Sequence, residues 1–130
     1  MAAIKTGLIG FGRMGNFYLE EMRKSGKFEV VYICDVNEEA CELARRVAPE
    51  AKVVSDEQII FDDPEVQVVG LFALADSRRE QIEGAFAAGK HVIAEKPIAD
   101  SMENERQAVE LAESTPLLST VNLSVSTARY

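Results

Sequence analysis

Three glycines, Gly10, Gly12 and Gly15, form the pattern G-x-G-x-x-G directly after the apolar segment 4–9. The next segment, residues 13–24, has apolar residues at helical spacing, so the glycines lie in a turn between a strand and a helix. In such a turn the first glycine permits a tight bend, the second lets the backbone approach a pyrophosphate, and the third lets the helix pack against the strand. The free amides and the dipole of the helix N-terminus then favour an anion. This context predicts a dinucleotide site in preference to a purely structural turn.

Strand and helix patterns alternate along the chain. The expected strands are 4–10, 28–34, 52–54, 66–74, 91–94 and 116–121. The expected helices are 13–24, a segment capped by Asn37 that ends before Pro49, a short one through Phe61, one from Ser77 to Gly89, and one from Ser101 to about Glu113. Because the connections are short, we expect an α/β fold: a doubly wound parallel sheet of six strands in the order 3-2-1-4-5-6. Its ligand crevice would lie where strands 1 and 4 diverge.

Local signals predict the ends and faces of these helices. The segments 55–58 and 77–80 have the pattern of capping boxes, in which a serine accepts from the first helical turn. The first helix is expected to bury Phe17, and the fourth is expected to bury Ile82 and Ala85.

The charge balance limits the classes of partner. The chain has 14 Lys and Arg against 22 Asp and Glu, a formal net charge of −8, which disfavours nucleic acid and anionic membranes. The N-terminus lacks the regions of a signal peptide, and no apolar run is long enough to span a bilayer. Cys34 and Cys41 have the spacing of neither a disulfide framework nor a metal site, so they are expected to be buried free thiols. We therefore expect a soluble, cytoplasmic protein without a metal centre.

Asp35 ends the second expected strand, 20 residues beyond Gly15, where a ribose-binding carboxylate belongs. A 2′-phosphate would face this carboxylate, and the next residues, Val36 and Asn37, supply no arginine. The sequence therefore favours NAD over NADP. Taken alone, Asp35 would more often be a carboxylate that accepts loop amides.

Three arginines leave two interpretations open. Arg13 follows the glycine turn and either contacts the adenine or a phosphate, or lies in solvent. Arg78 and Arg79 begin a helix, where cations are mildly unfavourable. They either pair with Asp76 or Glu80, or one of them faces the crevice and meets an anionic ligand.

The tripeptide Glu95-Lys96-Pro97 follows the fifth expected strand, at the sheet edge where ligands of such folds collect. Pro97 restricts Lys96 to an extended conformation beside the expected nicotinamide end. There the ammonium would hydrogen-bond a substrate hydroxyl or relay its proton. On generic grounds alone, a loop lysine in water is the commoner case.

Five motifs in this order resemble the N-terminal domain of the glucose–fructose oxidoreductase / inositol dehydrogenase / rhizopine catabolism (Gfo/Idh/MocA) family. They are GLIGFGRMG at 7–15, CD at 34–35, DPEV at 63–66, AGKHV at 88–92 and EKP at 95–97. The resemblance covers about residues 5–121. It implies that Lys96 is catalytic and that the bond before Pro97 is cis. The cofactor contacts that it implies come from Gly10, Phe11, Gly12, Arg13, Met14, Gly15, Asp35, Ala73, Leu74, Glu95, Lys96 and Pro97.

The chain departs from the family pattern after the fourth expected strand. Members commonly have Thr-Pro and then a His there, whereas this chain has the residues 73–76, ALAD, and Arg78 at the position of the His. The loop beside the nicotinamide is therefore expected to differ in shape and charge.

The resemblance also implies an activity and a domain organisation. It implies hydride transfer between a nicotinamide and a hydroxyl-bearing carbon of a sugar, inositol or related polyol. We expect residues 1–121 to form the dinucleotide domain and 122–130 to begin the connection to a C-terminal substrate domain that also carries the usual homo-oligomer surface. Without that domain the isolated chain is expected to be inactive. A non-enzymatic nucleotide-sensing module and a domain that has lost cofactor binding are the alternatives.

Overall fold

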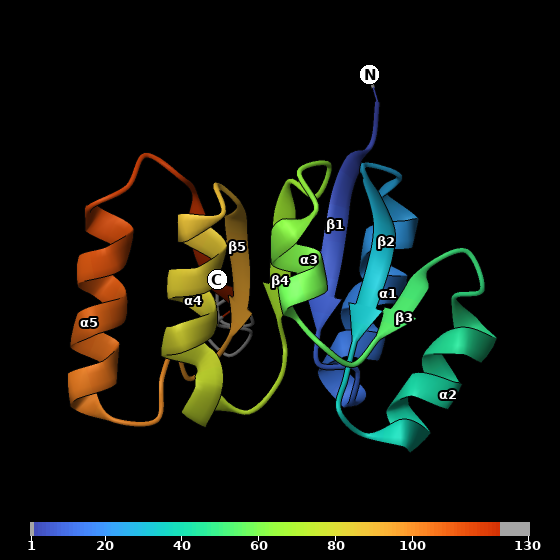
Figure 1. Cartoon of the computed structure of the whole chain (residues 1–130), viewed down its shortest axis with the longest axis horizontal. Coiled ribbons are helices and arrows are strands. Elements are labelled where there is room, and N and C mark those ends of the chain that lie inside the picture. The colour runs from blue at the N-terminus through green and yellow to red at the C-terminus, as the bar shows by residue number, and fades with distance from the viewer. Residues whose placement is uncertain (1, 123–130) are drawn as a thin grey trace, which may run out of the picture.

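Six parallel strands form one sheet in the spatial order β3-β2-β1-β4-β5-β6. The computed structural model describes residues 2–122 (Figure 1). The strands are β1 Ile4–Ile9, β2 Phe28–Cys34, β3 Lys52–Val54, β4 Val68–Leu71, β5 His91–Glu95 and β6 Ser119–Asn122. The expected fold class and strand order are therefore confirmed.

Helices cover both faces of this sheet (Figure 1). They are α1 Arg13–Ser25, α2 Glu38–Val47, α3 Gln58–Asp62, α4 Arg78–Ala87 and α5 Met102–Glu113, with a 3₁₀ turn, η1, at Ala75–Ser77. Leu19 of α1 and Ala44 of α2 pack in one apolar cluster. Ile60 of α3, Ile82 of α4 and Ala108 of α5 pack in a second cluster on the opposite face. The sheet is thus a buried middle layer, which explains its near-continuous apolar strands.

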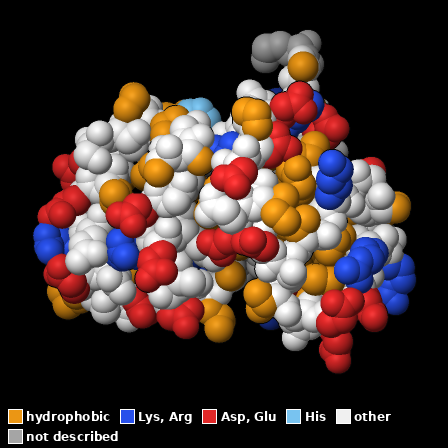
Figure 2. Space-filling view, in the orientation of Figure 1, with side chains coloured by type: hydrophobic (Ala, Val, Ile, Leu, Met, Phe, Trp, Pro, Cys, Tyr) orange, Lys and Arg blue, Asp and Glu red, His pale blue; other side chains and the backbone are white. Residues whose placement is uncertain are grey.

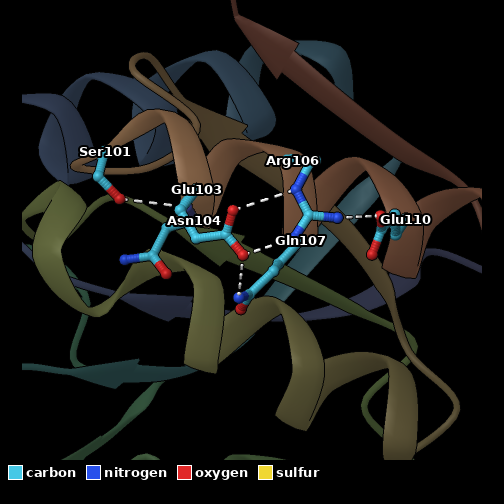
Figure 3. Close-up of polar contacts among 6 residues, drawn as sticks. All are labelled: Ser101, Glu103, Asn104, Arg106, Gln107 and Glu110. Atoms are coloured by element: carbon cyan, nitrogen blue, oxygen red, sulfur yellow. Dashed lines mark hydrogen bonds and ion pairs between the residues drawn. The ribbon is translucent and has the colours of Figure 1, made fainter.

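Two of the expected N-caps are confirmed. The side chain of Asn37 accepts from the amide of Ala40 at 3.1 Å, and Ser101 Oγ accepts from the amide of Asn104 at 3.1 Å (Figure 3). Gly26 ends α1 with a φ of +68°, in the left-handed region that glycine adopts without steric cost. These local signals set the ends of α1, α2 and α5 where the sequence predicted them.

The polar face of α5 is held by interactions between its own side chains (Figure 3). Arg106 pairs with both Glu103 and Glu110, and Gln107 Nε2 donates to Glu103 Oε1 at 2.9 Å. Acidic side chains extend across this face of the molecule from α5 toward α2 (Figure 2). Exposed pairs of this kind contribute only a few tenths of a kcal/mol each, so burial of the other face of α5 holds it on the sheet.

Both predicted capping boxes are wrong. At α3, Asp56 Oδ1 rather than Ser55 accepts from the first helical amide, that of Gln58, at 2.9 Å. At α4, Ser77 makes no side-chain cap, and its hydroxyl donates to the carbonyl of Leu74 at 3.3 Å. The residues at which the two helices begin, Glu57 and Ser77, do not have the extended backbone that is typical of a capping serine.

The fourth strand is shorter than the segment 66–74 that the apolar run predicted. It covers Val68–Leu71, because the amide of Val66 bonds back into the preceding turn. Beyond the strand the amide of Phe72 still donates to the carbonyl of Ile9, at 2.7 Å, and then the chain leaves the sheet. The apolar residues of the segment 66–74 that lie outside β4 flank the two ends of this strand and do not lengthen it.

Phe17 does not face the core as predicted, since 51% of it is exposed. The buried positions of α1 are Gly15, Leu19 and Met22, which are spaced by four and three residues on one helical face. Phe17 lies on the opposite face, where its ring meets the edge of Tyr18.

The strand register brings the candidate site together. Ile9 is opposite Cys34 on one side and Leu71 on the other, and Leu71 is opposite Ala94. The carboxyl ends of β1, β2, β4 and β5 therefore meet at one edge, as do the loops that follow them.

Candidate cofactor site

The glycine turn is tightly packed at Gly10 and Gly15 and open at Gly12. A Cβ on Gly10, whose φ is +95°, would lie 2.4 Å from the amide nitrogen of Ala73. A Cβ on Gly15 would lie 2.3 Å from the carbonyl oxygen of Gly10. A Cβ on Gly12 would have no atom within 4 Å. The first and third glycines are thus required by the fold itself, whereas the second leaves room for a group to approach.

The N-terminus of α1 retains donors for an anion. Gly12 is its N-cap residue and has no side chain to satisfy the first amides, and the first turn has no acidic residue. Those amides have no acceptor within the helix. Arg13 is exposed and Met14 is half-buried against the apolar cluster of α1 and α2, so Arg13 is the one that extends into solvent here.

Asp35 holds the turn in addition to facing the crevice. Its Oδ2 accepts from the amide of Phe11 at 2.7 Å, and its Oδ1 accepts from the amide of Asn37 at 2.9 Å. Both interpretations of this carboxylate are therefore compatible, because each oxygen has a second lone pair for a hydroxyl donor.

A crevice of about 680 Å³ lies where β1 and β4 diverge. Of the predicted residues, it is lined by Gly10, Gly12, Asp35, Ala73 and Leu74. Its other polar lining residues are Ser55, Asp56, Glu57, Asp76, Ser77 and Gln81, and its apolar walls are Ile9, Cys34, Val36 and Phe72. Apolar walls suit a purine, Asp35 suits the ribose hydroxyls, and the space at Gly12 suits the pyrophosphate. The residues present therefore fit a nicotinamide dinucleotide.

A second hollow, of about 710 Å³, lies on the α1 and α2 side of the same carboxylate. Arg13 and Arg46 line it together with Asp35 and Asn37. The sequence interpretation considered only the residues that directly follow Asp35, so it missed Arg46, which is a full helix away along the chain.

Arg78 is 2% exposed and lies behind the crevice. Its guanidinium donates to three main-chain carbonyls, those of Ala73, Glu95 and Pro97, the last at 2.6 Å. Burial lowers the pKa of Arg78, and the charge of Glu95 opposes that shift. Arg78 therefore ties the loop after β4 to the loop after β5. Neither interpretation from the sequence described this role.

Arg79 makes the ion pair with Glu80 that one interpretation predicted, at 4.0 Å. It also makes one that was not predicted, with Glu83 at 3.7 Å. Arg78 turns into the protein and Arg79 turns out, because neighbouring residues point about 100° apart around a helix.

Lys96 and Pro97 are exposed and Glu95 is buried at the carboxyl end of β5. The bond between Lys96 and Pro97 is cis, as the resemblance implied. This loop does not line the crevice, but Arg78 joins it to Ala73, which does.

The thiols are not candidates for nucleophilic chemistry. Cys34 and Cys41 are both buried and free, as predicted. Burial raises the pKa of Cys34 to about 12, so its thiolate is scarce near neutral pH. Among residues 2–122, no group of three or more His, Cys, Asp or Glu side chains is placed to hold a metal ion.

The sequence contained one signal for the buried polar residues that it did not assign. Arg78 and Gln81 share the helical face of Ile82 and Ala85, with the spacing of an inward stripe. Polar side chains in a buried stripe need partners inside the protein or in a site.

Residues 4–123 match the family described as "Oxidoreductase family, NAD-binding Rossmann fold". Over 111 residues the chain is 34% identical to inositol 2-dehydrogenase of Pseudomonas savastanoi pv. phaseolicola, a match that covers 83% of this chain and 33% of that protein. The chain thus spans about a third of the length of this relative.

Two similar solved structures contain NADH. Levoglucosan dehydrogenase in complex with NADH is 26% identical with a TM-score of 0.84, covering 92% of this chain and 34% of that one. The WlbA dehydrogenase from Bordetella pertussis, in complex with NADH and UDP-GlcNAcA, is 25% identical with a TM-score of 0.85, covering 93% and 37%.

Proposed function

The chain belongs to the Gfo/Idh/MocA family of oxidoreductases, which has an NAD-binding Rossmann fold, and from this premise we propose that it binds NAD(H) in preference to NADP(H). The observation that carries the proposal is the position of the Asp35 carboxylate at the wall of the crevice. A carboxylate accepts hydrogen bonds from two ribose hydroxyls and repels a 2′-phosphate. Every charged side chain that lines the crevice is acidic. Arg13 and Arg46 line the hollow on the other side of Asp35, together with the acidic Glu39 and Glu42.

In the whole protein we propose a dehydrogenase for a sugar, inositol or related polyol. Residues 1–121 would form the cofactor domain and 122–130 would lead to a substrate domain; residues 123–130 lie outside the part that the structure describes. The free buried thiols support a reducing, cytoplasmic location. No helix within residues 2–122 combines the length and apolar character needed to cross a membrane.

Bound NAD supplies the hydride acceptor for oxidation of a hydroxyl-bearing carbon. Lys96 is the residue of this chain that we assign to the accompanying proton. Its amino group would hydrogen-bond the substrate oxygen and move the proton as the hydroxyl becomes a carbonyl. Arg78 keeps that loop beside the crevice through the carbonyls of Glu95 and Pro97.

Titration calorimetry of the chain with NADH and NADPH tests the cofactor assignment. We expect NADH to bind about 10–100-fold more tightly, the difference that hydrogen bonds to a charged group provide. Asp35→Ala should weaken NADH binding and reduce the difference in affinity between NADH and NADPH. Tighter binding of NADPH would overturn the choice of NAD, and binding of neither dinucleotide would overturn the cofactor function.

A further inference from the structure

Glu57 is a crevice residue whose carboxylate is held in place. It lies at the start of α3, is half-buried, and lines the same crevice as Asp35. Gln81 of α4, which is 4% exposed, donates from Nε2 to Glu57 Oε1 at 3.0 Å. A glutamate without such a partner keeps several side-chain conformations in water. Here a buried amide holds one negative charge at the wall of the crevice.

The strand register puts Glu57 near Asp35. Cys34 at the end of β2 is opposite Val54 of β3, and the amide of Asp35 donates to the carbonyl of Val54 at 3.1 Å. Asp35 and the segment 55–57 therefore leave the sheet at adjacent points of its carboxyl edge. Burial, and after it the charges of Glu57 and Asp35, raise the pKa of the Cys34 thiol to about 12. Both carboxylates thus lie close to Cys34, which lines the same crevice.

This position matters for the choice between the two dinucleotides. With its hydroxyls on Asp35, the adenosine ribose has its 2′ position at this end of the crevice. Charge repulsion falls off gradually with distance, so a carboxylate acts on a phosphate that it does not touch. On the premise, proposed above, that the crevice holds NAD(H), we infer that Glu57 is a second specificity-determining residue, which adds its charge to that of Asp35 against the 2′-phosphate of NADP(H).

The hollow on the far side of Asp35 defines the competing arrangement. Two cationic and two acidic side chains line it, those of Arg13, Glu39, Glu42 and Arg46. Glu57 does not line that hollow. A 2′-phosphate that enters the hollow would be indifferent to Glu57, whereas one at the crevice would be repelled by it. The two placements therefore predict different results for one substitution.

Glu57→Gln removes the charge and keeps the contact, because the new amide oxygen can still accept from Gln81. By calorimetry at about 0.05 M KCl we expect the ratio of NADH affinity to NADPH affinity to fall about 3–10-fold, mainly through tighter NADPH binding. This is the size of effect that one unit charge exerts on a phosphate dianion through water. At about 0.5 M KCl the effect of the substitution should shrink, since salt screens charges but not contacts. An effect of the same size at high salt would overturn the inference.

Glu103→Gln is the matched control. Glu103 also accepts from a glutamine, Gln107 Nε2 at 2.9 Å, but it lies on α5 and does not line the crevice (Figure 3). The substitution changes the net charge of the chain by the same amount, so the variant should keep the wild-type ratio. An equal fall in both variants would show that net charge sets the ratio, and would overturn the role of Glu57.

The outcomes separate this inference from the cofactor assignment. If the unaltered chain prefers NADH and Glu57→Gln keeps that ratio, the role of Glu57 is overturned while NAD binding stands. If the unaltered chain prefers NADPH, the choice of NAD is overturned, and the change in ratio on Glu57→Gln still decides the role of Glu57. Binding of neither dinucleotide overturns both. Should Glu57→Gln not fold, Glu57→Ala removes the same charge and takes its place.

Discussion

The amide of Phe11 donates to Asp35 Oδ2 across 2.7 Å, so the carboxylate that we assign to the ribose also braces the glycine turn. Phe11 is 1% exposed, and water cannot replace the lost acceptor there. Asp35→Ala should therefore lower the free energy of unfolding by about 1–3 kcal/mol, the cost of an unmatched buried donor.

Asp35→Asn should lose less stability, because its amide oxygen can still accept from the main-chain amide of Phe11. The main-chain amide of Asn37 would then donate to water. Urea unfolding of the two variants checks this order. Equal stability of Asp35→Ala and the unaltered chain would show that the turn holds itself.

Two of the glycines provide a matched pair of substitutions. A Cβ at Gly12 meets no protein atom within 4 Å, so Gly12→Ala should change the free energy of unfolding by less than about 1 kcal/mol, the ordinary effect at an N-cap. Gly12→Ala should weaken NADH binding about 10–100-fold, because the methyl group enters the space that we assign to the pyrophosphate. Gly15→Ala places its Cβ 2.3 Å from a carbonyl oxygen, and should destabilise the fold by about 1–3 kcal/mol. Thermal unfolding and NADH titration separate these effects, and a Gly12→Ala variant that binds NADH normally would contradict the placement of the pyrophosphate.

The sequence predicted most of what depends on periodicity, apart from the burial of Phe17 and the length of β4, and missed what depends on the partners of polar groups. The bounds of β2 and β3 follow from their β-branched runs, and α1 begins and ends where its glycines predict. Asp35 could be singled out as a candidate because its position is set by the length of one βαβ unit. These features are local, so nearby residues specify them.

Arg78 and Gln81 could not be assigned from spacing alone, because their partners are distant along the chain. Arg78 bonds to carbonyls 5, 17 and 19 residues away, and Gln81 bonds to Glu57. Main-chain carbonyls leave no mark in the composition of a sequence. The burial of Arg78 and Gln81 depends on how β4 and β5 align, which only the assembled sheet determines.

We expect the hydrogen bonds of Arg78 to hold the loop that contains Lys96 in its conformation. Arg78→Lys leaves one ammonium where a planar guanidinium spans three carbonyls, so the free energy of unfolding should fall by about 2–4 kcal/mol. Arg79→Lys is the neighbouring control. Its ion pairs are long and partly exposed, and the change should cost less than about 1 kcal/mol. Urea unfolding of both variants measures the difference, and similar small losses at the two positions would contradict a bracing role for Arg78.

Lys90 is a buried ammonium whose stability contribution should depend on pH. It is 2% exposed, and its Nζ donates to the carbonyls of Asp63 at 2.7 Å and Val66 at 2.8 Å. Lys90→Met leaves both carbonyls without this donor, so it should cost about 1–3 kcal/mol at pH 7. Burial lowers the pKa of Lys90 below its ordinary 10.5, against the opposing charges of Asp63 and Asp62.

Between that lowered pKa and 10.5 the unfolded chain binds more protons at Lys90 than the folded chain. The folded state therefore gains stability from this group as the pH rises through the window. The free energy of unfolding of the unaltered chain minus that of Lys90→Met should grow until pH 10.5 and stay constant above it. Urea unfolding of the two proteins from pH 7 to 11 measures this curve, and a Lys90 difference that falls with pH would show that the folded state favours the charged form.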